Sequence, residues 1–105
     1  MAVQSSDSFE NSKTLSETVS HVVERLLVVA ITDLDCNVRI RILRSLDETF
    51  DAELAQPESL SALFITLNDE IFEIRELTMV AIGRLSAMNP AFVMPRLRKV
   101  MIQLL

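Results

Sequence analysis

The sequence predicts an all-α protein made of helix pairs stacked one after another. The chain of 105 residues is half hydrophobic, yet it has one Gly, no Trp and no Tyr. Strands and hairpins depend on aromatic residues and glycine turns, so this composition disfavours a β-sheet. Leu, Ala, Met, Glu and Arg are abundant and favour helices. In addition, a set of residues recurs at a spacing of 36 along the chain, which is typical of repeat architectures.

Local signals mark where the first three helices begin. Residues 1–13 are polar and lack helical periodicity, and we expect them to form a disordered leader. Thr14 and Glu17 have the spacing of a capping box that opens the first helix. Asp35 stands where it can cap the second helix, and Pro57 suits the first turn of the third.

Two more helices follow in the second half of the chain. The fourth is expected from about Glu70 to about Ala87, and Asn89 and Pro90 separate it from a fifth. Pro95 either begins the fifth helix or kinks it. Residues 47–56 form a polar connector between the two pairs.

Apolar residues at helical spacing define the expected core. They are Leu15, Val19, Val22, Val23, Leu26, Leu27, Ala30 and Ile31 in the first helix; Val38, Ile42, Leu43 and Leu46 in the second; Phe50 and Leu54 in the connector; Leu60, Leu63, Phe64 and Leu67 in the third; Ile71, Ile74, Leu77 or Thr78, Val80 or Ala81, Ile82 and Leu85 in the fourth; and Phe92, Val93, Leu97, Val100, Met101, Leu104 and Leu105 in the fifth.

The repeat becomes visible when the chain is shifted by 36 residues. Asp33 then falls on Asp69, and Arg39 falls on Arg75. Each Asp precedes the second helix of its pair, and each Arg lies in that helix near the positive end of the helix dipole, where a cation needs compensation. We therefore expect a ladder in which Asp33 or Asp69 meets Arg39 or Arg75 across the boundary between repeats. Two independent surface pairs are the alternative.

Helix pairs with this period, and with an Asp and an Arg recurring at equivalent positions, are typical of a HEAT-type α-solenoid. We expect about five helices: two helix-turn-helix repeats, 14–49 and 57–88, and the first helix of a third, 90–105. Residues 14–105 are then one HEAT-repeat region. The sequence stops inside an apolar segment without a cap, so we expect it to be a fragment of a longer array.

Charge is distributed unevenly along the chain. Residues 1–76 hold all 15 acidic and 6 of the 10 basic residues, whereas residues 77–105 hold four basic residues and no acid. Arg96, Arg98 and Lys99 form a possible partner surface, although an incidental local excess is the simpler interpretation. No aromatic residues alternate with these cations, so we expect no nucleic-acid binding.

No set of residues predicts catalysis or a bound cofactor. His21 is the only histidine and has no expected nucleophile beside it, so an ordinary helix histidine is the favoured interpretation. Cys36 is flanked by carboxylates that disfavour a thiolate, which favours a structural cysteine over a reactive one. One His and one Cys are too few for a zinc site. Asp33, Asp35 and Asn37 resemble the start of a calcium loop, but its glycine and closing glutamate are missing.

Specific strings link the chain to a known family. They are FDAELAQ (Phe50–Gln56), LNDEIFEIRE (Leu67–Glu76), GRLSAMNPAFVMP (Gly83–Pro95) and LRKVMIQLL (Leu97–Leu105). Together they resemble the N-terminal HEAT region of the target-of-rapamycin (TOR) serine/threonine protein kinases. Residues 14–44 are similar in pattern and weaker in identity. The gly-rich and catalytic loops of a kinase are absent from this sequence.

This resemblance implies a role for the chain. It implies a non-catalytic scaffold segment that serves kinase dimerisation and docking of TOR-complex subunits in nutrient and growth signalling. Its partners would be proteins, including the rest of a dimeric parent, without direct membrane insertion. The implied location is cytoplasmic, with the parent recruited to endomembranes. A HEAT adaptor of another kind, such as a phosphatase scaffold or nuclear transport receptor, is the alternative.

Overall fold

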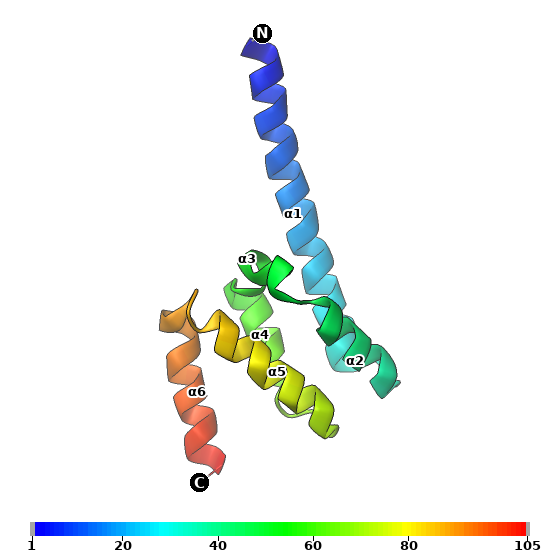
Figure 1. Cartoon of the computed structure of the whole chain (residues 1–105), viewed down its shortest axis with the longest axis vertical. Coiled ribbons are helices and arrows are strands. Elements are labelled where there is room, and N and C mark those ends of the chain that lie inside the picture. Colours follow the sequence, from blue (N-terminus) through cyan, green and yellow to red (C-terminus); the bar gives the residue numbers. More distant parts are fainter. Residues whose placement is uncertain (1, 105) are drawn as a thin grey trace.

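The computed structural model describes the backbone of residues 2–104 and the side chains of residues 13–103. Its elements, in order, are α1 (Ala2–Thr32), α2 (Cys36–Ser45), the 3-10 helix η1 (Glu48–Phe50), α3 (Asp51–Leu54), α4 (Pro57–Thr66), α5 (Phe72–Leu85) and α6 (Pro90–Leu104). The described residues contain no strand, so the predicted all-α class is confirmed (Figure 1). The connector expected at 47–56 is itself largely helical, which raises the number of α-helices from about five to six.

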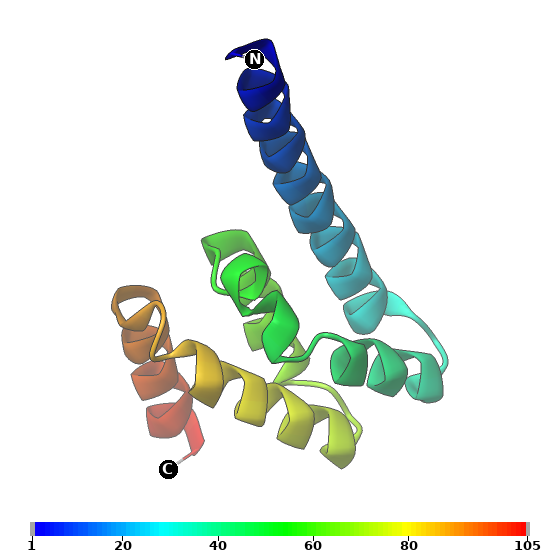
Figure 2. The same cartoon turned by 45° about the horizontal axis from the view of Figure 1, so that its top comes forward.

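The helices form pairs that stack side by side. Helix α1 packs against both α2 and α4, and α5 packs against both α4 and α2. The two pairs therefore lie next to each other in chain order, with α6 at the far end (Figures 1 and 2). This is the arrangement of an all-α helical repeat. Among the described residues, no helix is both long enough and apolar enough to cross a bilayer.

Helix α1 starts earlier than the sequence signals predict. It is helical from Ala2, so the described backbone of residues 2–13 is helix where we expected a disordered leader. No Gly or Pro interrupts residues 2–32, and each added residue gains one backbone hydrogen bond once a helix exists. Thr14 is consequently an interior residue rather than a cap, and its carbonyl accepts a hydrogen bond from the Thr18 hydroxyl at 2.9 Å.

The core is built where the pairs meet. Its fully or nearly fully buried apolar residues are Val23, Leu27, Ala30, Leu43, Leu46, Leu54, Ala55, Leu60, Leu63, Ile74, Ile82, Leu85 and Val93. Leu15 and Val22 were expected in this core and are instead 65% and 49% exposed. Leu15 lies toward the N-terminal end of α1, which projects beyond the body of the molecule (Figure 1). Val22 lies on the covered part of α1, next to the buried Val23, but on the face of the helix that is turned toward solvent.

In helix α5 the sequence left two choices open for the buried face, Leu77 or Thr78 and Val80 or Ala81. Thr78 is completely buried and Leu77 only partly, while Val80 is exposed and Ala81 half-buried. The Thr78 hydroxyl tolerates burial because its oxygen lies 2.7 Å from the Thr66 hydroxyl and 2.8 Å from the Ile74 carbonyl.

Helix α6 begins at Pro90, so Pro95 is inside the helix rather than at its first turn. The amides of Phe92 and Val93 donate to the Asn89 carbonyl, which closes the first turn before Pro95 is reached. Val93 is completely buried, and Phe92 and Leu97 pack against the core, so α6 is anchored to the second pair. On the C-terminal side, Met101 and Ile102 are exposed, and the side chains of Leu104 and Leu105 lie outside the described residues.

Candidate functional site

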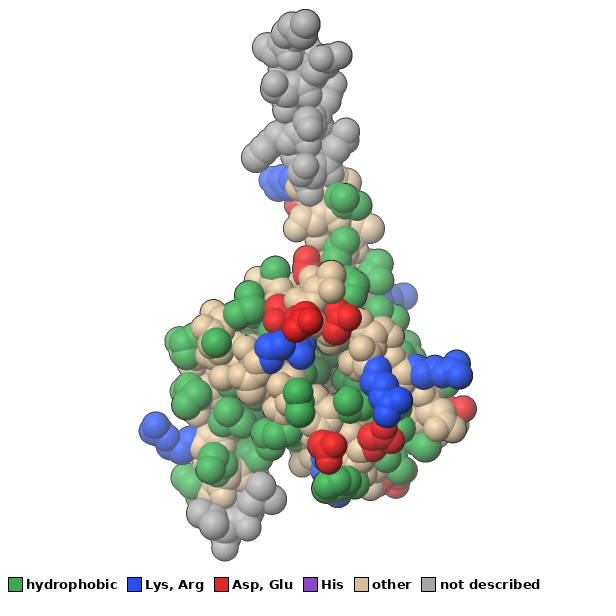
Figure 3. Space-filling model, viewed as in Figure 1, with side chains coloured by type: hydrophobic (Ala, Val, Ile, Leu, Met, Phe, Trp, Pro, Cys, Tyr) green, Lys and Arg blue, Asp and Glu red, His purple; other side chains and the backbone are tan. Residues whose placement is uncertain are grey.

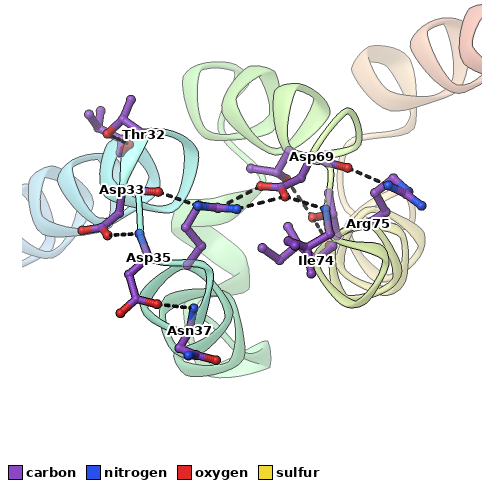
Figure 4. Close-up of polar contacts among 12 residues, drawn as sticks. Thr32, Asp33, Asp35, Asn37, Asp69, Ile74 and Arg75 are labelled. Carbon is purple, nitrogen blue, oxygen red and sulfur yellow. Dashed lines mark hydrogen bonds and ion pairs between the residues drawn. The ribbon is translucent and has the colours of Figure 1, made fainter.

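The two interhelical turns have the same local geometry. Asp33 Oδ1 accepts a hydrogen bond from the Asp35 amide at 2.8 Å, and Asp69 Oδ1 accepts one from the Ile71 amide at 2.9 Å. Asp35 and Ile71 occupy equivalent N-cap positions with nearly equal backbone angles. In the first turn Asp35 also caps α2 through the Asn37 amide, as the sequence predicts (Figure 4). The 36-residue sequence repeat is thus accompanied by a repeat of the backbone conformation in the two turns.

Arg39 ties these two turns together. Its Nε donates to Asp69 Oδ2 at 3.0 Å and its Nη2 to Asp69 Oδ1 at 3.3 Å, while Nη1 donates to the Asp33 carbonyl at 2.5 Å. The side chains of Arg39 and Asp69 are only 7% and 9% exposed. The guanidinium therefore bridges the turn of its own pair and the carboxylate of the next pair, in the two-pronged geometry that arginine favours.

The electrostatics of this contact follow from its geometry. Hydrogen bonding to the Asp69 carboxylate raises the pKa of Arg39 above its ordinary value, against the opposing effect of desolvation. Arginine is charged at all physiological pH values, so its charge is offset mainly by Asp69 rather than by water.

Arg75 repeats half of this arrangement. Its Nη1 donates to the Asp69 carbonyl at 2.7 Å, just as Arg39 donates to the Asp33 carbonyl (Figure 4). Its guanidinium carbon also lies 5.7 Å from the centre of the Phe72 ring. The structure therefore brings Arg39 and Asp69 together across the two repeats, and no contact joins Asp33 to Arg75.

The second predicted surface lies on α6. Arg96, Arg98 and Lys99 are all exposed, and the Arg96 guanidinium stacks 3.6 Å from the centre of the Phe92 ring. Arg98 shares a shallow groove of about 340 Å³ with apolar residues that include Met94 and Met101. Hydrophobic side chains are prominent over this part of the molecule (Figure 3). Of the three cations, Arg98 therefore borders an exposed apolar groove.

Two further ion pairs between helices have no counterpart in the sequence pattern. Arg44 of α2 pairs with Glu73 of α5 on the surface, and Arg84 Nε of α5 contacts both carboxylate oxygens of Asp51 at 2.8 and 3.0 Å. Neither pair recurs at the 36-residue spacing, so the repeat could not predict them. The sequence showed only that residues of opposite charge were present in the predicted helices and the connector.

The residues considered for chemistry are scattered. His21 is exposed on α1, and Cys36 is half-buried against the core at the start of α2. Within the residues that the structure describes, no three His, Cys, Asp or Glu side chains are grouped closely enough to hold a metal ion.

The stacked pairs, and the ion pair that joins α2 to the turn of the next pair, define a helical-repeat protein. No family model matches the chain. It is 79% identical over all 105 residues to the serine/threonine-protein kinase mTor of Drosophila melanogaster. It is also 53% identical over 89 residues to tor1 of Schizosaccharomyces pombe and 47% identical over 89 residues to TOR of Arabidopsis thaliana, which cover 85% and 83% of the chain.

The chain is therefore a segment belonging to the TOR serine/threonine-protein kinase family. It spans about 4% of the length of each of these curated relatives. The resemblance to the TOR kinases that the sequence motifs predict is confirmed at the level of the family.

Proposed function

We propose that this chain is a non-catalytic scaffold segment of the N-terminal HEAT array of a TOR kinase. In this role it helps the kinase to dimerise and to dock the other subunits of its complexes in nutrient and growth signalling. The observation that carries the proposal is the buried Arg39–Asp69 pair, which joins one helix pair to the next and makes the segment a continuous array.

The absence of catalysis is part of the proposal. The relatives are named as protein kinases, but the chain corresponds to about 4% of their length and is helical throughout its regular elements. We assign phosphoryl transfer to another part of the parent protein. The matches to TOR relatives favour this assignment over a phosphatase scaffold or a nuclear transport receptor.

The surfaces available for docking are the outer faces of the helices. Met94, Met101 and Ile102 are at least half exposed on α6, beside Arg98 and Lys99. Apolar side chains rimmed by charge are characteristic of protein interaction sites. The proposed partners are therefore other parts of the parent solenoid and protein subunits of the complex, in the cytoplasm, with the parent recruited to endomembranes through its assembly.

The experiment uses the full-length parent kinase carrying Met101→Asp and Ile102→Asp together. We expect the dimer fraction measured by light scattering, or the recovery of a co-purified subunit, to fall at an unchanged protein level. Val80→Asp is the matched control because Val80 is 64% exposed on α5, outside the α6 surface. Unchanged mass and unchanged subunit recovery in the double variant would contradict a docking role for this segment.

A further inference from the structure

A shallow hollow of about 200 Å³ lies between α1 and α4, the first helices of the two pairs. Its lining residues are Glu24, Leu27 and Val28 of α1 and Glu58, Ser59 and Ala62 of α4. The two helices pack against each other and run in the same direction (Figure 1). Each repeat of a helical array contacts only its neighbours, so helix pairs before or after this segment would stack elsewhere and leave the hollow open.

Each helix brings a glutamate and an apolar residue to the hollow. Glu24 is followed one turn later by Val28, and Glu58 by Ala62, and residues four apart share one face of a helix. Both glutamates are exposed, and neither takes part in an ion pair within the described part of the chain. Because the helices run in the same direction, the two carboxylates lie toward one end of the hollow and the apolar residues toward the other.

Ser59 is the buried polar residue of the hollow. It is only 2% exposed, and its hydroxyl has no hydrogen-bond partner among the described residues. The Ala55 carbonyl, one turn earlier, accepts a hydrogen bond from the Asn89 side chain at 3.0 Å. A hydroxyl that is almost fully buried usually has a partner, because its desolvation is otherwise not offset. A hydrogen-bond donor that enters the hollow would supply the partner that Ser59 lacks.

These groups select a primary ammonium on an apolar stem. Two carboxylates and a hydroxyl oxygen can all accept hydrogen bonds, and a lysine ammonium has three N–H donors and no acceptor. The N-terminal end of α4 carries a partial positive charge of about half a unit, which the two carboxylates outweigh. The hollow has room for about six water-sized atoms, and the four-carbon stem of lysine can cover Val28 and Ala62.

We propose that the hollow between α1 and α4 binds a lysine side chain of a protein subunit that docks on the parent kinase. The ammonium lies between Glu24 and Glu58 and donates to the Ser59 hydroxyl, while the stem lies on Val28 and Ala62. An arginine fits less well, because a planar guanidinium pairs with one carboxylate through two parallel bonds. The inference rests on the proposed function, since it gives the scaffold a contact with a subunit, and it places that contact away from α6.

The test is the reactivity of subunit lysines toward an acylating reagent, measured by mass spectrometry on the full-length parent with its subunits. Only the free amine is acylated, and two carboxylates favour the ammonium. One subunit lysine should therefore react about tenfold faster when the parent carries Glu24→Gln and Glu58→Gln together. Glu76→Gln, at an exposed glutamate of α5, is the matched control and should change no lysine. The proposal is overturned if no subunit lysine responds, as when a free polyamine fills the hollow, or if the control has the same effect.

Two further variants test the individual contacts. Ser59→Ala should raise the reactivity of the same lysine by about threefold, since one of its three acceptors is lost, and unchanged reactivity would overturn the role of the hydroxyl. Replacing the responding lysine by Glu should lower recovery of its subunit at least about tenfold, and combination with Glu58→Lys should restore part of it. No restoration would overturn the pairing. The Met101→Asp and Ile102→Asp variant, measured in parallel, reports separately on the proposed function, so either proposal can fail alone.

Discussion

The carboxylate of Asp69 is held by Arg39, a residue of the preceding helix pair, through contacts of 3.0 and 3.3 Å. Both side chains are more than nine-tenths buried. A buried carboxylate is stable only when its charge and hydrogen-bonding capacity are matched, so this contact fixes how the two repeats are placed.

Removal of the Asp69 carboxylate should therefore lower the stability of the fold strongly. Asp69→Ala leaves a buried guanidinium without its counter-ion, and we expect a loss of about 3 kcal/mol in the free energy of unfolding. Asp33→Ala removes a turn hydrogen bond without breaking an ion pair and should cost about 1 kcal/mol. Urea denaturation of the two variants measures both quantities.

A double-mutant cycle provides the control for that experiment. Arg39→Ala with Asp69→Ala should lose less stability than the sum of the single changes, because the two residues share one interaction. Asp33→Ala with Arg75→Ala should be additive within about 0.5 kcal/mol. Coupling in the second cycle and additivity in the first would reverse the assigned pairing.

The surface pair of Arg44 and Glu73 should contribute much less. Their side chains are 62% and 45% exposed, so water and salt screen their attraction. We expect Glu73→Gln to cost less than about 1 kcal/mol, and the cost should shrink in concentrated salt. Thermal unfolding at low and high ionic strength tests this, and a salt-independent loss would indicate that Glu73 acts through something other than its charge.

Two leucines of α1 form a matched pair for testing where the helix is supported. Leu27 is 1% exposed and Leu15 is 65% exposed. Leu27→Ala should cost about 3 kcal/mol through lost burial and a residual cavity, whereas Leu15→Ala should change stability by less than about 0.5 kcal/mol. Equal losses in the two variants would show that the projecting part of α1 is packed against something.

Asp47 should make stability fall in acid. Hydrogen bonding to Thr49, through its side chain and backbone, lowers the pKa of Asp47 below its ordinary value in the folded chain. The folded state therefore binds this proton less readily than the unfolded state. The contribution of Asp47 is complete above a pH of about 4, and it is lost as pH falls through the lowered folded pKa.

An NMR titration of the Asp47 carboxyl carbon measures this pKa directly. Asp47→Asn keeps a side-chain acceptor for the Thr49 amide and removes the titrating group, so its stability should vary less with pH below about 4. A folded-state pKa of Asp47 at or above its ordinary value would refute the expectation.

Much of this architecture is encoded locally. Helical periodicity, Asp35 as an N-cap and Pro57 at the first turn of α4 all act within a few residues, and the structure confirms them. The recurrence of Asp and Arg at 36 residues marks equivalent positions without any knowledge of the fold. Helix α1 departs from its local signals because helix propagation continues through the polar segment before Thr14.

The sequence by itself determined the helical class, the 36-residue repeat and the positions at which Asp and Arg recur. Only the tertiary structure decided that Arg39 binds Asp69, that Arg75 lacks an equivalent carboxylate among the described residues, and that Leu15 is exposed while Leu27 is buried. The reason is physical. Capping and periodicity depend on neighbours along the chain, whereas ion pairing and burial depend on which helices lie side by side after the pairs have packed.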